Sequence, residues 1–360
     1  MNGPNAGALA AATTQDLISA PYPSAAATMA GAPAHRLSVV VPMYNEKENA
    51  TALVDEVDRA LADYPSPWEL IVVDDGSRDG TGAILERHAA TIGPHIRVIR
   101  LWRNFKQTAA MQAGIDASRG DVIVTMDGDL QNDPRDIPKL VNRLLTGDLD
   151  FVAGWRKDRQ DGFWLRKFPS RIANALIRKS TGLQFNDLGC SLKAFRGSVL
   201  REVRLYGEMH RFIPAWLATV TSPARMDEVP VNHRARVAGT SKYGLGRTFR
   251  VITDLLAMHF FLNYGTRPGH FFGGIGLGVG SIGGVILAWM AVLKIMGQSI
   301  GGRPLLTLGF FMVIAGLQFL LTGVVAELMI RIYYDGNHAR PYHHGQGAAP
   351  ADDTAWHRAG

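Results

Sequence analysis

The sequence predicts an α/β domain with a mostly parallel β-sheet, followed by interfacial amphipathic helices and a hairpin of two transmembrane helices. Three observations support this fold class. Short apolar runs with strand character alternate with helical segments through the first part of the chain, which is the pattern of a parallel sheet. A basic amphipathic stretch follows. The last third of the chain contains two long uncharged apolar runs.

The composition narrows the class of protein. The net charge of +6 is compatible with nucleic acid, anionic lipid or a phosphorylated substrate as a partner. The single cysteine, Cys190, excludes an internal disulfide framework and a cysteine-based zinc site, and we expect it to be a small buried residue. Residues 1–34 are rich in Ala, Gly, Pro and Ser and lack Lys and Arg. They predict a disordered leader instead of a signal peptide, so the catalytic region should stay in the cytoplasm.

The predicted elements alternate along the chain. Strands are expected at residues 37–41, where Pro42 ends the strand, and at 68–73, 96–101, 122–125 and 151–154. Helices are expected at residues 46–62, capped by Asn45, then from Thr81, and at 108–118 and 134–146. Polar residues follow the strand ends, so Tyr44, Glu46, Asp75 and Asp127 should gather along one edge of the sheet.

The motif Asp127-Gly128-Asp129 follows the apolar strand at residues 122–125, which ends in Met126. At the carboxyl end of a parallel strand, two carboxylates separated by one glycine can turn oxygen atoms toward a hard divalent cation, Mg²⁺ or Mn²⁺. A solvated acidic turn has the same local sequence. Neighbouring motifs therefore have to decide between the two interpretations.

Five motifs occur in one order along the chain: VPMYNE (41–46), VVDDGSRDGT (72–81), RNFKQTAAMQAGIDASRGD (103–121), MDGDLQNDP (126–134) and DLGCSLKAFR (187–196). They closely resemble the inverting, nucleotide-sugar-dependent family 2 glycosyltransferases of the GT-A fold. Within this family the chain resembles the polyprenyl-phosphate glycosyltransferases, the branch that includes dolichyl-phosphate mannose synthase and the bacterial bactoprenol glucosyltransferases. The resemblance covers about residues 37–334.

The resemblance implies a set of site residues. Asp127 and Asp129 would hold the metal and act in catalysis together with Arg156. Gln131 would complete the metal shell or hold a phosphate, although an exposed amide on a turn is the alternative. The donor is expected to contact Pro42, Tyr44, Glu46, Val73, Asp75, Asp127, Gly128, Asp129, Gln131, Arg236 and Lys242. A cation between the acids would stabilise the charge that grows on the leaving nucleoside diphosphate.

The acceptor side is expected near the basic amphipathic segment at residues 155–179 and near Asp187. Arg156 and Arg171 would meet the acceptor phosphate or the anionic membrane surface, although a solvated basic helix has the same pattern. We nominate no general base, because a lipid monophosphate has a second pKa of about 6 and is already ionised. Asp187 either positions the acceptor or is a structural cap. His210 is expected to make structural hydrogen bonds.

Two uncharged apolar runs, about residues 271–293 and 305–326, are each long enough to span a bilayer core of about 30 Å. Basic residues before the first run and after the second place both termini in the cytoplasm. Glu327 is expected to pair with Arg331 one helical turn later. Glycines in the first run suit close helix contact within the hairpin or between subunits. The family resemblance suggests a homo-oligomer formed through the hairpin, and specifically a tetramer.

These inferences divide the chain into a disordered leader (1–34), a cytoplasmic GT-A domain (35–235), a donor-closing loop with an interfacial helix (236–268), the hairpin (269–334) and a disordered cytoplasmic tail (335–360). The expected activity is inverting transfer of one sugar from UDP-glucose, or a related UDP-sugar, to polyprenyl (undecaprenyl) phosphate. It would take place at the bacterial cytoplasmic membrane, without a nucleic-acid partner.

Three alternatives stay open. One is a polyprenyl-phosphate mannosyltransferase that uses GDP-mannose. Another is an enzyme of the same fold that acts on a different glycolipid or on a sugar hydroxyl, which would need an acceptor-side base. The third is a non-catalytic two-span scaffold that retains the nucleotide-sugar fold. A Gln-x-x-Arg-Trp signature, typical of the processive polysaccharide synthases of the wider family, does not occur near residues 206–216, which argues against polymer synthesis.

Overall fold

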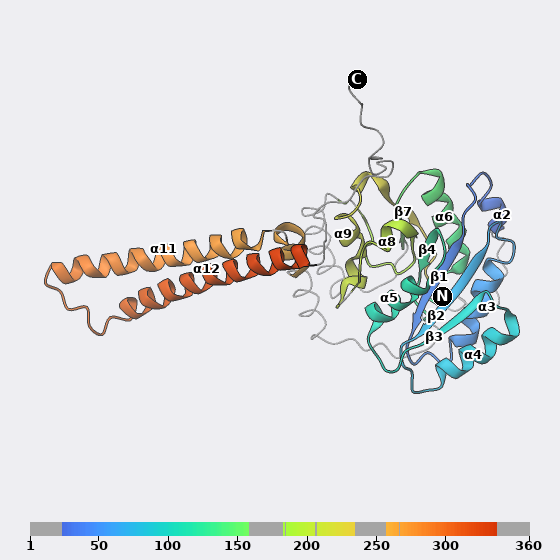
Figure 1. Ribbon diagram of the computed structural model, residues 1–360, viewed down its shortest axis with the longest axis horizontal. Helices are drawn as coiled ribbons and strands as arrows, with labels where there is room; N and C mark the ends of the chain where they lie inside the picture. Colours follow the sequence, from blue (N-terminus) through green and yellow to red (C-terminus); the bar gives the residue numbers. More distant parts are fainter. Residues whose placement is uncertain are drawn as a thin grey trace, which may run out of the picture. The chain divides into compact units, whose positions relative to one another are not determined.

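The structure is a computed structural model that describes residues 24–157, 183, 185–205, 207–234, 257–265 and 267–336. The chain divides into two compact units. One is a sheet unit that contains the described strands, and the other is a helical unit that contains two long helices (Figure 1).

The sheet has seven strands in the order β3-β2-β1-β4-β6-β5-β7. Their bounds are β1 Leu37–Met43, β2 Trp68–Asp74, β3 Ile96–Arg100, β4 Val122–Thr125, β5 Phe151–Trp155, β6 Lys193–Arg196 and β7 Met226–Pro230. β1 is parallel to β2 and β4, β2 is parallel to β3, and β5 is parallel to β7. β6 runs antiparallel to β4 and β5. The start of β6 therefore lies at the same sheet edge as the ends of β4 and β5.

Helices cover both faces of the sheet. The longer ones are α3 Ala50–Ala60, α4 Thr81–Ile92, α5 Gln107–Ala117 and α6 Ile137–Thr146, and the short ones are α2 Ala25–Thr28, η1 Pro134–Asp136, α8 Gly197–Leu200, η2 Met209–Phe212 and η3 Pro223–Arg225. Leu53 of α3 and Leu85 of α4 are buried in the main hydrophobic core. Ala110 of α5 packs with Ile71 and Val73, which point to the opposite face of β2. The predicted mostly parallel α/β sheet is confirmed.

Two predicted boundaries are wrong. β1 continues through Pro42, where we expected it to end. β4 pairs with β1 only as far as Val40, so the missing N–H of Pro42 costs no hydrogen bond on that side. The first long helix begins at Ala50 instead of Glu46, because Asn45 has a left-handed φ of 53° and starts a turn.

The predicted disordered leader is wrong for its last part. Residues 24–34 include α2, whose first turn is capped by the Ser24 hydroxyl accepting the N–H of Ala27 at 3.1 Å. Ala25 and Met29 are buried in the main core. Apolar burial therefore decides the structure here in spite of the small-residue composition. Residues 1–23 lie outside the described residues.

The helical unit contains the short α9 Ile213–Leu217 and the long helices α11 Pro268–Ile295 and α12 Pro304–Gly336. Both long helices are apolar and long enough to cross a membrane. They pack closely at glycines: a Cβ on Gly276 would lie 2.7 Å from the carbonyl oxygen of Gly316, and one on Gly283 would lie 2.9 Å from that of Gly309. Close helix contact within the hairpin, which we expected from the glycines, is present.

Glu327 has a partner in the other long helix, and its expected pairing with Arg331 stays a prediction. One carboxylate oxygen of Glu327 in α12 accepts the backbone N–H of Gly269 at 3.4 Å, in the first turn of α11. A carboxylate at this place satisfies an N–H that has no partner within its own helix and interacts favourably with the helix dipole. The side chain of Arg331 and residues 337–360 lie outside the described part of the chain.

Candidate active site

A cleft of about 370 Å³ opens at the carboxyl ends of β1, β2 and β4. Its walls are formed by Pro42, Met43, Tyr44, Glu46, Asp75, Asn104, Lys106, Gln107, Ala110, Asp127, Gly128 and Asp129. The three strands are parallel neighbours, so motifs that are far apart in the sequence meet at one edge. The structure thereby brings together most of the residues that we predicted to contact the donor.

The turn between β1 and α3 is held by side chains of the loop that follows β2. Three consecutive backbone N–H groups, those of residues 45–47, donate to the Ser77 hydroxyl at 2.9 Å, the Thr81 hydroxyl at 3.1 Å and an Asp79 oxygen at 3.2 Å. The VPMYNE and VVDDGSRDGT motifs are therefore one structural unit. Their joint turn places Tyr44, which is 43% exposed, on the cleft wall.

Asp75, directly after β2, holds the loop that follows β3. Its two oxygens accept the backbone N–H groups of Phe105 at 2.7 Å and Lys106 at 2.9 Å. Burial raises the pKa of Asp75, and these two hydrogen bonds oppose the rise. Gly76 lies against the same loop, since a Cβ there would come within 2.3 Å of a backbone carbon of Arg103. Asp75 therefore shapes the cleft wall.

Asp127 and Asp129 follow β4 and line the cleft. Gln107, the first residue of α5, donates a side-chain N–H to Oδ1 of Asp127 at 2.7 Å. Burial and the neighbouring charge of Asp129 raise the pKa of Asp127, while a hydrogen bond with Ser191 and two nearby cations oppose the rise. Asp127 is thus crowded by like charge and held by donors from α5 and from the segment before β6.

This pair of carboxylates fits a hard divalent cation. Carboxylate oxygens are the ligands that Mg²⁺ and Mn²⁺ prefer, and a cation would offset the repulsion between Asp127 and Asp129. Within the described residues, no group of three or more His, Cys, Asp or Glu side chains could hold a metal. The remaining ligands would therefore have to come from substrate, from water or from an amide such as that of Gln131.

Gly128 is required by packing. A Cβ at this position would lie 2.6 Å from Cγ of Met43, which is itself only 2% exposed. Any larger residue would therefore displace Met43 or move the two acids. Leu130 completes the turn with a left-handed φ of 61°.

The segment after the acids pairs with residues 232–234. Arg234 donates its backbone N–H to the carbonyl oxygen of Gln131 at 2.9 Å, and the side-chain nitrogen of Gln131 lies 3.5 Å from the carbonyl oxygen of Arg234. The guanidinium of Arg234 forms salt bridges with Glu56 at 2.7 Å and with Asp133 at 3.0 Å. These contacts anchor the chain just before residues 235–256, which contain Arg236 and Lys242 and lie outside the described residues.

Arg156, directly after β5, forms a bidentate ion pair with Asp187. Its Nε and Nη2 atoms donate to the two carboxylate oxygens at 2.7 and 3.0 Å, and its backbone N–H donates to Oδ2 at 3.3 Å. The two side chains are only 13% and 10% exposed. Burial alone would lower the pKa of Arg156, but the hydrogen bonds and charge of Asp187 outweigh it and the pKa is raised. Arg156 is also close enough to Asp127 for their charges to interact.

A buried lysine beside these groups was missed in the sequence. Lys193, at the start of β6, is 3% exposed, and its Nζ donates to the carbonyl oxygen of Cys190. Burial lowers the pKa of Lys193, and the charges of Asp127 and Asp187 are among those that oppose the change. Burial also raises the pKa of Cys190 to about 11, as expected for a small buried residue. The DLGCSLKAFR motif contained Lys193, but only the antiparallel pairing of β6 turns its side chain toward the acids.

Three further cleft residues were quoted in a motif without a role. They are Asn104, Lys106 and Gln107. Oδ1 of Asn104 is buried and has no hydrogen-bond partner among the described residues. A run of amide and basic residues directly after a predicted strand was the signal that could have found them.

Other predicted residues lie away from the cleft wall. The side chain of Val73 is fully buried against Ile71 and Ala110, so the prediction that it contacts the donor is wrong for its side chain. His210 lies with Nδ1 2.5 Å from the hydroxyl of Thr108 in α5, which agrees with the structural role that we expected. Arg171 and most of the predicted basic amphipathic segment lie outside the described residues.

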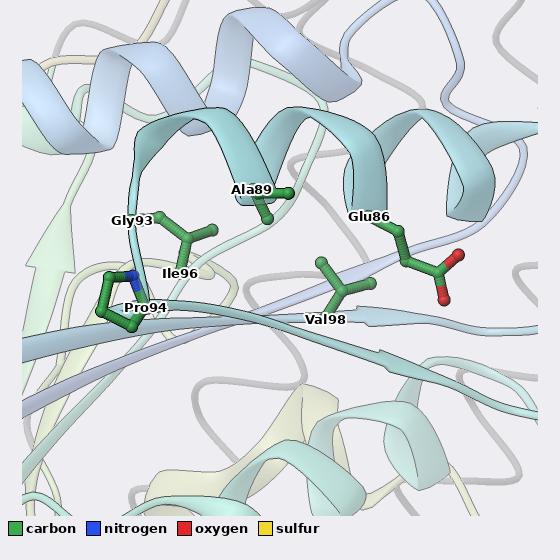
Figure 2. A pocket seen from close by; sticks show the side chains of 7 residues that line it. Glu86, Ala89, Gly93, Pro94, Ile96 and Val98 are labelled. Carbon is green, nitrogen blue, oxygen red and sulfur yellow. The ribbon is translucent and has the colours of Figure 1, made fainter.

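A second hollow, of about 380 Å³, lies between α4 and β3 and is lined by Glu86, Ala89, Ala90, Gly93, Pro94, Ile96 and Val98 (Figure 2). Its walls are mostly apolar, and Glu86 is the one ionisable side chain among them. It lacks the convergent polar groups that mark a catalytic site. The cleft with the acid pair is therefore the candidate active site.

Comparison with known proteins agrees with this geometry. The family model described as Glycosyl transferase family 2 matches residues 38–204. A dodecaprenyl-phosphate galacturonate synthase from Rhizobium johnstonii is 51% identical over 299 residues, which cover 83% of this chain and 88% of the relative. The chain belongs to glycosyl transferase family 2. This glycosyltransferase is therefore an enzyme of the class that its motifs predicted.

More distant relatives support the same assignment. An undecaprenyl-phosphate 4-deoxy-4-formamido-L-arabinose transferase from Pseudomonas fluorescens is 34% identical, over 86% of this chain and 88% of the relative. The crystal structure of glucosyl-3-phosphoglycerate synthase from Mycobacterium tuberculosis superposes with a TM-score of 0.50 at 23% identity, covering 65% of this chain and 81% of that one. That likeness concerns the fold alone. The predicted GT-A fold of this family 2 glycosyltransferase is confirmed.

Proposed function

We propose that this glycosyltransferase transfers one sugar from a nucleotide-diphosphate sugar to a polyprenyl phosphate at the cytoplasmic face of a bacterial inner membrane, with inversion at the anomeric carbon. The product would be a polyprenyl-phosphate sugar and a nucleoside diphosphate. Relatives that are named polyprenyl-phosphate sugar transferases or synthases and the two apolar helices support this activity.

The observation that carries the proposal is the arrangement of charge at one sheet edge. Asp127 and Asp129 lie at the end of β4, and Arg156 lies at the end of β5, close enough to interact with Asp127. An acid pair suited to a metal–diphosphate complex thus lies near an arginine suited to phosphate. Both reacting partners of a polyprenyl-phosphate glycosyltransferase carry phosphate.

The chain's own residues would bind and orient the two substrates. Tyr44 can stack on the nucleotide base, and Glu46 and Asp75 offer acceptor oxygens to the base and ribose. Gln107 and Ser191 keep the carboxylate of Asp127 directed into the cleft. Mg²⁺ or Mn²⁺, when bound by Asp127 and Asp129, supplies positive charge to the leaving diphosphate.

Arg156 would hold the acceptor phosphate for attack on the anomeric carbon. The phosphate is ionised near neutral pH, since its second pKa is about 6, so no side chain needs to remove a proton. Asp187 is engaged by Arg156 through both oxygens, which suits a positioning role better than that of a base. Arg236 and Lys242 remain proposed pyrophosphate ligands.

The sequence motifs do not determine which sugar is transferred. UDP-glucose was the expectation, and the relative at 51% identity is named for galacturonate. We therefore propose UDP-galacturonate as the preferred donor and UDP-glucose as the competitor to measure beside it. A homo-oligomer formed through the hairpin, with both termini in the cytoplasm, is also part of the proposal.

The test uses the full-length protein in lipid nanodiscs with polyprenyl phosphate, Mg²⁺ and each labelled UDP-sugar in turn. We expect lipid-linked label with the wild type and none with Asp129→Ala. The matched control is Asp121→Ala, because Asp121 is an exposed acid near the start of the same strand, paired with Arg36. Titration of Mn²⁺ with UDP into both variants gives a second readout besides turnover. Full transfer by Asp129→Ala in the presence of chelator would refute the metal role, and labelling of a sugar hydroxyl instead of polyprenyl phosphate would refute the acceptor.

A further inference from the structure

The exposed aromatic residues of the sheet unit gather at one edge. Among its described residues, the large apolar side chains that are exposed are Tyr44 at 43%, Trp102 at 101% and Phe105 at 44%. Tyr44 follows β1 and lines the active-site cleft. Trp102 and Phe105 follow β3 and are not among the residues that line it, so the donor does not account for their exposure.

The loop that carries these two aromatics, Leu101–Lys106, is held firmly. Leu101 donates its backbone N–H to the carbonyl oxygen of Asp74 at 2.9 Å. The N–H groups of Phe105 and Lys106 donate to the carboxylate of Asp75 at 2.7 and 2.9 Å. Trp102 is thus presented to solvent between two fixed points. Two large exposed apolar side chains, Trp102 and Phe105, thus occur together in one fixed loop, and grouped exposed apolar surface marks an interaction site.

A basic group lies over one of the exposed rings. The guanidinium of Arg103 lies over the ring of Phe105 at 4.6 Å from its centre. Neither Arg103 nor Lys106 forms a salt bridge with another described residue. Lys106 lines the cleft, so Arg103 is the cation of this loop that is available to anions outside the cleft. Apolar rings beside a cation are the composition of a membrane-interface anchor.

We propose that the loop Leu101–Lys106 is a bilayer-contact surface. Trp102 and Phe105 enter the boundary between headgroups and acyl chains, and Arg103 meets anionic headgroups. The chain contains two helices long and apolar enough to cross a membrane, which would keep the enzyme near a bilayer. The contact would hold the rim of the cleft at the surface where a lipid acceptor presents its phosphate, and in this respect it rests on the proposed function.

The test places a fluorophore in the loop of the full-length protein. Trp102→Cys is labelled with an environment-sensitive dye and the protein is reconstituted in phosphatidylcholine vesicles with and without phosphatidylglycerol. The matched control is Ala90→Cys, an exposed position in α4 near the opposite, amino end of β3; Figure 2 shows this end of the strand at Pro94 and Ile96. The unsubstituted chain is the labelling control, because Cys190 is buried.

We expect a blue-shifted emission at position 102 and several-fold stronger quenching by lipids spin-labelled near the headgroup than at position 90. The quenching should increase with phosphatidylglycerol and decrease at high salt. Equal emission and quenching at the two positions would overturn the proposal. A second result would also overturn the proposal: self-quenching of the dye at position 102 that rises with the protein-to-lipid ratio, with no quenching by the spin-labelled lipids. That result would assign the loop to contact between copies of the chain.

A kinetic measurement separates this proposal from the proposed function. Trp102→Ala should raise the KM for polyprenyl phosphate in vesicles several-fold and leave the KM for the nucleotide sugar unchanged. If the wild type transfers no sugar to polyprenyl phosphate, the proposed function fails, while the fluorescence experiment still decides the membrane contact. An unchanged KM for both substrates together with strong lipid quenching would show a contact without a role in acceptor capture and would overturn the link to the acceptor.

Discussion

The ion pair of Arg156 and Asp187 gives the sharpest prediction for catalysis. Asp187→Asn keeps one oxygen that can accept from the guanidinium but removes the charge and the second acceptor. Hydrogen bonds to charged groups contribute about 1.5–3 kcal/mol each. At about 1.4 kcal/mol for a tenfold change in rate, loss of one of the two side-chain hydrogen bonds should lower kcat/KM by about 10- to 150-fold. Asp187→Ala is less useful, because breaking a buried pair costs about 3–5 kcal/mol, which is a large fraction of the stability of a domain.

The assay is the initial rate of lipid-linked sugar formation in nanodiscs, measured across pH with both substrates varied. If Asp187 only orients Arg156, the loss should appear mainly in the KM for polyprenyl phosphate, and the acid limb of the pH profile should keep its position. In an Arg156→Lys background the same substitution should have little further effect, since the bidentate pair is already absent.

A matched control is available in a second arginine–aspartate pair. Arg36 and Asp121 lie 3.3 Å apart but are 62% and 55% exposed, so Asp121→Asn should change stability by less than about 1 kcal/mol and leave transfer unchanged. A general base at Asp187 predicts the opposite pattern. Loss confined to kcat, removal of the acid limb and additivity with Arg156→Lys would refute the positioning role.

Three further predictions follow from packing and charge. Gly76→Ala should abolish donor binding and lower the melting temperature strongly, because its Cβ would lie 2.3 Å from the backbone of Arg103. Gly80→Ala is the control, since Gly80 also has a positive φ but open space around it, and it should cost only about 1–2 kcal/mol. Equal effects of the two substitutions in calorimetry would contradict the steric argument. Gln107→Glu should weaken Mn²⁺–UDP binding, because it replaces the 2.7 Å donor to Asp127 with a like charge. Titration calorimetry of this variant beside Gln107→Ala checks the prediction. Tighter Mn²⁺–UDP binding by Gln107→Glu would refute it. Gly276→Leu should disrupt the hairpin, whereas Gly278→Leu should not, because a Cβ on Gly276 would meet α12 and a Cβ on Gly278 would meet nothing within 4 Å. A change of oligomeric mass with Gly278→Leu alone would assign that face to contact between subunits.

The order of elements could be predicted from the sequence because each strand and helix has a strong local signal. Buried runs such as 122–125 and the two long apolar segments are recognisable without any tertiary information. Boundaries were less predictable. β1 passes through Pro42 because its neighbour β4 has already stopped pairing, and the first helix starts late because the turn at residues 45–47 hydrogen-bonds to the loop after β2. Both effects depend on contacts with distant segments.

The residues of the candidate site also separate into those that the sequence predicted and those that only the structure revealed. Tyr44, Glu46, Asp75 and the acid pair could be predicted, since each lies within a few residues of the end of a parallel strand and such ends converge. Lys193 and the partner of Arg156 could not, because their positions depend on β6 running antiparallel between β4 and β5. The short segment before β6 carries no periodicity that reveals this direction.

The sequence by itself determined the class of enzyme, the acid motif and the two long apolar helices, because these depend on local composition and on strand ends. Only the tertiary structure decided that Arg156 is bound by Asp187, that Gln107 holds Asp127 and that Trp102 is fully exposed beside the cleft. The physical reason is that hydrogen bonds, ion pairs and exposure are set by residues far apart in the chain, which meet only when the strands take their places in the sheet.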